Sequence, residues 1–345
     1  VVDVDIHQNW KSAEEIAKYL PRRYKTHGVR VPNLLHVPSF GRPIRDDVEA
    51  EGEIAADPEA LADQHLNPNG VDFGILTGPA RMTMGALNNR DYAVELARAY
   101  NKCVLNDWLA EDDRLGGAIL IAPTNPEGSA ELIDEFGSED QFVQVQWLGH
   151  PGLTMGHTNH WPIYEAAEDA DLPISVHPAI DTEGNLPMTA AGNESSFFEY
   201  AVNVPLPYIA HLTSLVKEGV FQEFPDLKFA WTEMGFEWLP WFMWRLDDHW
   251  KAHRGDAPWV DRRPSESILE RVRFTTQPMI LPDSLEHFFH MLDMIDAENT
   301  LMYSSDFPHY DGDDIDTIEI YIPDDIKENV LHHNAAEFYN LPQRI

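Results

Sequence analysis

The sequence predicts an α/β protein, a distorted (β/α)8 (TIM) barrel with insertions over the C-terminal mouth. Apolar runs of four to seven residues alternate with helix-like segments, which is typical of parallel βαβ units. Eight such runs in 345 residues fit a closed barrel better than an open doubly wound sheet. No Gly-x-Gly-x-x-Gly follows a strand, which disfavours a dinucleotide-binding fold.

The elements alternate regularly along the chain. The predicted strands are 1–7, 71–76, 116–122, 141–147, 173–177, 228–232, 271–275 and 300–304. The predicted helices between them include 90–109, 126–136, 161–170, 236–251 and 283–294. Residues 28–70, which are irregular and rich in proline and acidic residues, and residues 178–227 are predicted insertions within one barrel domain of residues 1–345. In a barrel, insertions after a strand lie over the active-site mouth.

Composition places limits on the class of protein. Hydrophobic residues make up 43% of the chain, with ten Trp and sixteen Phe, which argues against disorder. No apolar run reaches the ~18 residues of a membrane span, and the start lacks the basic and apolar regions of a signal peptide. The lone Cys103 excludes an internal disulfide. We therefore expect a cytoplasmic protein.

The charge is strongly negative. Asp and Glu outnumber Lys and Arg by 59 to 24, giving a formal charge of −35, and only eight residues are Lys. This balance argues against nucleic acid or an anionic membrane as partners. The acidic excess runs along the whole chain, which favours a salt-accumulating halophile over an ordinary acidic protein. Molar salt shortens the Debye length to ~3 Å and screens the self-repulsion.

The first seven residues carry an unusual set of polar side chains. Alternation in a strand would put Asp3, Asp5 and His7 on one face and the apolar residues on the other. A buried strand does not tolerate such groups without partners, and a metal ion is a simple partner for Asp5 and His7. Asp3 is expected to be a structural neighbour of these ligands. The alternative is a strand whose polar face contacts water.

Ligand-type residues recur where predicted strands end. His7, His177, Glu233 and Asp306 each stand at or just after the end of an apolar run. Active-site groups of a barrel gather at the C-terminal ends of its strands. One such histidine is more typical of a hydrogen-bonded core residue, but four groups at equivalent ends indicate a metal site.

Several segments then resemble one known family. Residues 2–7 resemble the Ile-Asp-x-His-x-His opening of the amidohydrolase superfamily, with Asp5 at the position of the first His. Residues 305–309, Ser-Asp-Phe-Pro-His, are similar to a signature of its amidohydrolase-related branch, which includes aminocarboxymuconate-semialdehyde decarboxylase. Residues 219–228 and 334–336 are similar to two further segments of that branch, so the resemblance spans almost the whole chain.

The resemblance implies one divalent metal ion, Zn²⁺ or Mn²⁺, held by Asp5, His7, His177 and Asp306. It also implies that Asp306 accepts a proton from metal-bound water, because a metal lowers the pKa of that water. A second register would use Asp5, His7 and Asn9, but an amide is a poor ligand and Asn9 lies beyond the apolar run.

Glu233 stands where most members of the branch have a His, which departs from the expected pattern. Glu233 could act as a catalytic acid or base if burial raises its pKa. It could equally anchor a neighbouring network.

Other residues near the mouth are weaker candidates. His309 is a candidate catalytic group for proton transfer, and His211 and Gln277 are candidates for substrate binding. The alternatives are a capped loop, a packed helix face and a plain turn, respectively. Three histidines between 150 and 160, namely His150, His157 and His160, could bind metal, although a solvated loop is favoured.

Three tryptophans recur at helical spacing around Arg245: Trp241, Trp244 and Trp250. This spacing indicates a helix face used for core packing or for contact between two copies of the chain. A homodimer is therefore expected.

The main functional prediction is a metal-dependent hydrolase. Metal-bound water, activated by Asp306, would attack an amide, a lactone or a similar C–X bond in a small molecule. The alternative is a non-oxidative decarboxylase of an aromatic or unsaturated carboxylic acid, which would make the substrate a carboxylate. A third possibility is an inactive protein that keeps the barrel for binding.

Overall fold

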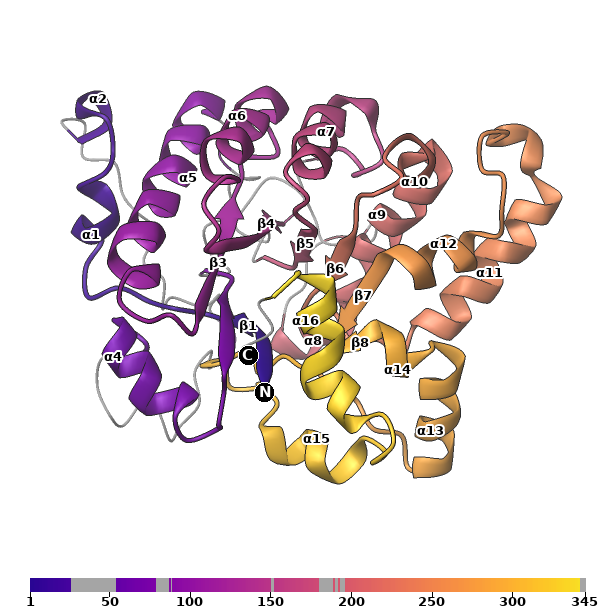
Figure 1. Cartoon of the computed structure of the whole chain (residues 1–345). Helices are drawn as coiled ribbons and strands as arrows, with labels where there is room; N and C mark the ends of the chain where they lie inside the picture. The colour runs from indigo at the N-terminus through magenta and orange to yellow at the C-terminus, as the bar shows by residue number, and fades with distance from the viewer. Residues whose placement is uncertain are drawn as a thin grey trace.

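The computed structural model describes residues 1–25, 54–78, 87, 89–149, 152–179, 189, 192 and 196–341. Eight parallel strands form one sheet in the order β1 to β8, each paired with its neighbours in sequence. Helices lie around the strands (Figure 1). The predicted (β/α)8 barrel is confirmed.

All eight predicted strands form, most of them slightly shorter than expected. They are β1 Val2–Ile6, β2 Phe73–Leu76, β3 Leu115–Leu120, β4 Phe142–Leu148, β5 Ile174–His177, β6 Phe229–Trp231, β7 Val272–Thr275 and β8 Leu301–Met302. The largest difference is at β8, where only two of the five predicted residues pair regularly with β7.

The helices follow the predicted pattern with local adjustments. The α-helices are α1 Glu14–Ala17, α2 Arg22–Lys25, α4 Pro58–Leu61, α5 Arg90–Val104, α6 Pro126–Phe136, α7 Trp161–Asp169, α8 Phe197–Asn203, α9 Pro205–Glu218, α10 Val220–Glu223, α11 Leu239–Ala252, α12 Pro264–Arg271, α13 Leu285–Met294, α14 Ala297–Thr300, α15 Ile315–Tyr321 and α16 Asn334–Phe338. The shorter η segments are η1 Ala62–Leu66, η3 Leu105–Leu109, η4 Thr158–His160, η6 Arg254–Asp256 and η7 Asn329–His333. Helix α6 matches its predicted bounds because Asn125 caps its first turn and Pro126 fits its first position.

The two predicted insertions are described only in part. The described end of 28–70 contains α4 and η1, whereas residues 26–53 lie outside the described residues. The described end of 178–227 contains α8, α9 and α10, so part of this segment is the helical connection between β5 and β6. The division into one domain with two insertions stays a prediction.

The barrel closes at a junction between β1 and residues 303–307, which we call the seam. Backbone N–H groups donate across it from Val4 to Tyr303 (3.1 Å), from Asp306 to Asp5 (3.1 Å) and from His7 to Phe307 (2.8 Å). In a regular ladder β1 would pair with β8 itself, and not with the residues that follow β8. The seam therefore brings Asp5 and Asp306 together from opposite ends of the chain.

A cluster of apolar side chains lies inside the barrel. Val2 and Val4 pack with side chains of β2, β4, β6 and β8, and with Phe338 of α16. Because these strands lie on opposite sides of the barrel, the cluster fills the barrel interior. Helix α16 covers the end of the barrel. The ring of Phe338 also lies 5.8 Å from Lys228 Nζ and 5.7 Å from Arg273 Cζ.

Removing this ring should destabilise the fold. Phe338 is 4% exposed, so Phe338→Ala is expected to lower the free energy of unfolding by about 3–5 kcal/mol through lost burial and a cavity. Ile320→Ala, at a 68% exposed position on α15, should change it by less than about 0.5 kcal/mol. Urea unfolding measures both variants, and equal effects would contradict the packing role of Phe338.

The predicted alternation of β1 is wrong in one respect. Asp5 and His7 share an environment, but the side chain of Asp3 bonds instead to His65, outside that environment. Val4 joins the interior cluster and Ile6 joins the larger core around the barrel. The physical reason is an irregular register between Asp3 and Ile6, which breaks the two-residue period.

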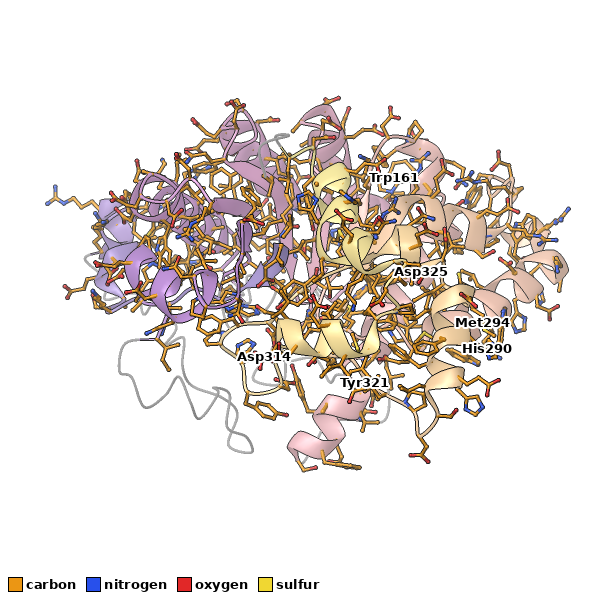
Figure 2. The ribbon with its side chains drawn as sticks, turned by 60° about the horizontal axis from the view of Figure 1, so that its bottom comes forward. Trp161, His290, Met294, Asp314, Tyr321 and Asp325 are labelled. Atoms are coloured by element: carbon orange, nitrogen blue, oxygen red, sulfur yellow. The ribbon has the colours of Figure 1, made fainter. Side chains whose placement is uncertain are left out.

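Exposed carboxylates such as Asp314 and Asp325 lie at the surface in Figure 2. Within the described ranges, no helix has both the length and the apolar character needed to cross a membrane. The halophile origin and the cytoplasmic location stay predictions.

Candidate metal centre

Side chains from the ends of four strands converge at one end of the barrel. His177 Nε2 lies 2.9 Å from Glu233 Oε2 and 3.4 Å from Asp5 Oδ2. His7 Nε2 lies 3.7 Å from Asp5 Oδ1, 3.9 Å from Glu233 Oε2 and 2.9 Å from Asp306 Oδ1. Metal bonds of about 2.1 Å separate neighbouring ligand atoms by roughly 3.4 Å in a tetrahedron, so this spacing fits one ion.

Both histidines have one ring nitrogen fixed by the backbone. His7 Nδ1–H donates to the carbonyl of Gly78, and His177 Nδ1–H donates to the carbonyl of Pro178. When the imidazole is neutral, the other nitrogen of each ring, Nε2, therefore carries the lone pair. This is the tautomer that metal-binding histidines adopt.

Four buried atoms of the cluster have no hydrogen-bond partner. They are Asp5 Oδ2, His7 Nε2, His177 Nε2 and Glu233 Oε2. Their short contacts lack the alignment of hydrogen bonds, and one ligand atom from each residue lies within 4.8 Å of the others. Buried polar atoms left unpaired are costly, so their convergence fits a cation that would satisfy all four. The residues present therefore fit one divalent metal ion.

The electrostatics of the cluster also favour a cation. Burial opposes ionisation of Asp5, but the imidazoles of His177 and His7 outweigh it and lower the pKa of Asp5 to about 2. Burial likewise opposes the charged form of His7, yet Asp5 and Asp306 raise its pKa to about 9. The pKa of His177 is raised well above its usual range by Asp5 and Glu233 against the effect of burial.

Asp306 lies beside this group and has its own hydrogen-bond partners. Gln277 Nε2 donates to Asp306 Oδ2 (3.0 Å), and His309 Nδ1 lies 2.7 Å from Asp306 Oδ1. Burial raises the pKa of Asp306 to about 6, despite its contact with His7. Burial also lowers the pKa of His309 to about 4. At neutral pH, Asp306 is thus a carboxyl group that gains and loses a proton easily.

The backbones of Glu233 and Asp306 are in an unusual conformation. Their φ angles are +57° and +56°, in the left-handed region that costs a non-glycine residue about 1–2 kcal/mol. Each is held by a hydrogen bond from its own N–H, to Thr275 Oγ1 for Glu233 and to the Asp5 carbonyl for Asp306. Such strain at strand ends is typical of functional sites.

The structure separates some predicted candidates from the cluster. His211 lies on α9, where its Nδ1 accepts from the Met155 N–H and its ring packs beside Tyr208. None of its described contacts is with the converging ligand atoms. Asn9, from the second register, donates its backbone N–H to the Ala55 carbonyl. Two other predicted candidates, His309 and Gln277, do lie beside the cluster.

The histidines after β4 do not form a metal group among the described residues. His157 Nδ1 accepts from the Asn159 N–H, and His160 is buried with its ring 5.1 Å from that of Trp147. Burial lowers the pKa of His160 to about 4. His150 lies outside the described residues.

Sequence reasoning missed Thr77. Its hydroxyl donates to Asp5 Oδ1 (2.5 Å) from just after β2, and it is buried. The same strand-end rule that identified His177 applies to Thr77, so the signal was present in the sequence.

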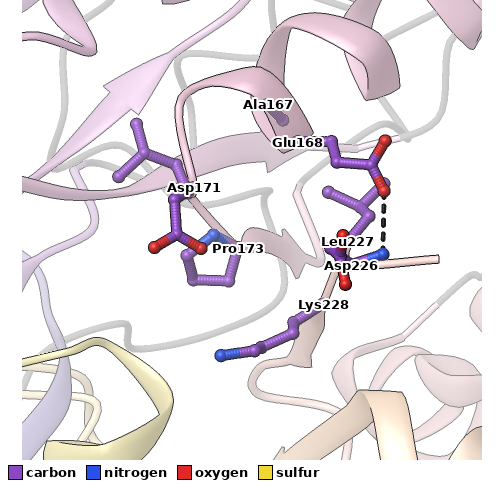
Figure 3. Close-up of a pocket in the computed structure, with 8 residues that line it drawn as sticks. Ala167, Glu168, Asp171, Pro173, Asp226, Leu227 and Lys228 are labelled. Carbon is purple, nitrogen blue, oxygen red and sulfur yellow. Dashed lines mark hydrogen bonds between the residues drawn. The ribbon is translucent and has the colours of Figure 1, made fainter. Parts of the chain in front are cut away.

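A small pocket lies away from the cluster (Figure 3). It is lined by Glu168, Asp171 and Lys228 near the starts of β5 and β6, and Glu168 Oε1 accepts from the Asp226 N–H (2.8 Å). Its cavity of about 10 Å³ holds at most one water molecule. It lies at the opposite ends of the strands and is too small for a substrate.

A (β/α)8 barrel with carboxylates and imidazoles converging at its strand ends defines the class of metal-dependent barrel enzymes. The chain belongs to the amidohydrolase family, whose profile matches residues 2–341.

The chain is also similar to a protein of known activity. The chain is 25% identical over 246 residues to γ-resorcylate decarboxylase of Rhodococcus jostii, covering 65% of this chain and 69% of that protein.

Solved structures share the fold. One is a dihydroxybenzoic acid decarboxylase from Polaromonas, determined with bound manganese and the inhibitor 2-nitroresorcinol (TM-score 0.73, 19% identity, 99% of this chain and 96% of that chain). Another is an amidohydrolase from Mycobacterium avium subsp. paratuberculosis (TM-score 0.76, 15% identity, 100% and 99%).

These comparisons correct the main functional prediction. A hydrolase was expected, but the Rhodococcus jostii relative is a decarboxylase, and so is the Polaromonas protein with the same fold. The prediction of an enzyme with one divalent metal ion is supported by the family match and the ligand cluster, and the Polaromonas protein carries manganese. Zinc has no specific support.

Proposed function

We propose that this chain is a metal-dependent, non-oxidative decarboxylase of a hydroxylated aromatic carboxylic acid. The observation that carries the proposal is the set of four buried, unpartnered ligand atoms beside a carboxyl group whose pKa is raised to about 6. The decarboxylase relative supports the reaction class.

In this proposal Asp5, His7, His177 and Glu233 hold the ion, and Asp306 borders it. Two carboxylates in the donor set suit a hard ion such as Mn²⁺. When bound, the ion would supply positive charge that holds the carboxylate of the substrate. Glu233 thus takes a ligand role in place of the acid–base role considered from sequence.

Decarboxylation breaks the bond between the ring carbon and the carboxylate, and CO₂ leaves. The electron pair stays on the ring carbon, which must take up one proton. Asp306 in its neutral form is the proposed donor, because burial raises the pKa of its carboxyl group to about 6, so that a minor fraction carries a proton near neutral pH. His309 contacts Asp306 and is 24% exposed, so it is the proposed route by which the carboxylate regains a proton from solvent.

Gln277 is the proposed orienting and substrate-binding residue. Its Nε2 is bonded to Asp306, whereas its buried Oε1 has no partner and could accept from a substrate hydroxyl. Substrate binding by His211 stays a prediction that its described contacts do not support.

The homodimer also stays a prediction. Trp241 and Trp244 are 53% and 61% exposed on α11, so neither is a core residue, and both offer an apolar face to a second copy. Trp250 instead packs inward and donates to the Val260 carbonyl.

The reaction is tested by measuring CO₂ release from a panel of mono- and dihydroxybenzoates. We expect turnover of at least one acid with Mn²⁺ present, loss of activity with a chelator, and recovery when Mn²⁺ is restored. A folded, Mn²⁺-loaded protein that releases no CO₂ from the whole panel would contradict the proposed reaction class.

A further inference from the structure

We propose that Asp3 and His65 form a positioning pair that fixes the seam of the barrel, and with it the relative placement of Asp5 and Asp306. The inference rests on the proposed metal site. Neither residue of the pair belongs to the converging ligand atoms.

One oxygen of Asp3 ties both sides of the seam together. Asp3 Oδ1 accepts from the backbone N–H of Ser305 (3.0 Å) and from that of Asp5 (3.2 Å). Ser305 directly precedes Asp306, so a single atom links the two chain segments that carry these carboxylates. Asp3 is fully buried, which makes those bonds costly to lose.

The other oxygen of Asp3 is held by His65, which reaches it from η1. His65 Nε2 lies 2.7 Å from Asp3 Oδ2, and its Nδ1 accepts from Asn69 Nδ2 (3.2 Å). Nε2 is therefore the nitrogen that donates to Asp3. The His65 ring also stacks on Phe307, with centroids 4.5 Å apart, so it contacts the far side of the seam as well.

The seam needs these side-chain hydrogen bonds because its regular strand pairing is short. Only two residues of β8 belong to the ladder, and the register of β1 shifts between Asp3 and Ile6. Asp306 is also held in a left-handed conformation. Three backbone hydrogen bonds cross the seam, one of them from Asp306 to Asp5, and the Asp3 bonds add to them in fixing the placement of these two residues. Outer partners of metal ligands commonly change metal affinity by 10–100-fold when removed.

The test is the Mn²⁺ dissociation constant of purified variants, measured from the EPR signal of free Mn²⁺. Asp3→Ala removes both backbone contacts and should weaken Mn²⁺ binding by about 10–100-fold. His65→Phe keeps the ring on Phe307 but removes the donor to Asp3, and should weaken binding by about 10-fold. Asp3→Asn keeps the Oδ1 acceptor but sets an amide N–H against the donating His65 Nε2, so it should weaken binding by about 10-fold, as His65→Phe does.

Asn101→Ala is the matched control. Asn101 is fully buried and also makes two backbone bonds, with the N–H and the carbonyl of Leu120, but it lies away from the seam. It should lower the melting temperature while leaving the Mn²⁺ affinity of the folded protein unchanged.

Three outcomes decide between the possibilities. If folded His65→Phe and Asp3→Ala both bind Mn²⁺ with wild-type affinity, the inference is overturned, but the proposed metal site is not. The same weakening in Asn101→Ala would show a general stability effect and would overturn it too. A wild-type chain that binds no Mn²⁺ would overturn the proposed metal site together with the inference.

Discussion

Replacing Asp306 with Asn is expected to lower kcat for decarboxylation by about 10²–10⁴-fold, the range for removal of a general acid. The amide keeps the shape of the carboxyl group and its place between Gln277 and His309, but it cannot donate a proton to the ring carbon. Initial CO₂-release rates at saturating substrate and Mn²⁺ measure the loss.

The control for this variant is Asp313→Asn. Asp313 lies on the same segment, and burial raises its pKa to about 7, but its carboxylate accepts from the Met279 N–H and lies outside the metal groups. It should retain kcat within about threefold, since the acceptor oxygen is kept. Asp306→Asn with wild-type kcat would refute Asp306 as the proton donor.

Replacing Glu233 with Gln is expected to weaken Mn²⁺ binding by more than about 100-fold, beyond the loss typical of an outer partner. The substitution removes one negative charge and replaces a carboxylate oxygen with a weaker amide oxygen in a group of four side chains. Equilibrium dialysis with metal analysis measures the affinity directly and does not depend on knowing the substrate.

Glu237→Gln is the matched control on the same loop. Burial raises the pKa of both Glu233 and Glu237, but the Glu237 carboxylate accepts from the N–H groups of Phe236 and Ile280. Its Mn²⁺ affinity should stay near that of wild type. If Glu233→Gln binds Mn²⁺ as tightly as Glu237→Gln does, Glu233 is not a ligand, and the acid–base role becomes the better explanation.

The local patterns in the sequence were sufficient for most of the barrel. The apolar runs at 173–177 and 228–232 predicted β5 and β6, and they also placed His177 and Glu233 at strand ends. Parallel strands carry their C-terminal ends to one side, so residues at those ends must meet. That rule needs only the position of each residue in its own strand.

The same reasoning failed where geometry departs from regular strands. A strict two-residue period put Asp3 beside Asp5, but the register shift in β1 turned Asp3 toward His65. Substrate binding by His211 stays a prediction, and the alternative of a packed helix face agrees with its place on α9 against Met155. The turn of Asp3 toward His65 could not be inferred from local alternation, since it depends on how an element packs.

The sequence by itself determined the eight-stranded barrel and the residues at its mouth, because strand periodicity and strand-end position are local properties. Only the tertiary structure decided that Glu233 joins the ligand atoms, that Asp306 is held by Gln277 and His309, and that Asp3 closes the seam. The bond between Asp3 and Ser305 joins residues 302 positions apart. Contacts of that range arise from closure of the barrel, which no local pattern records.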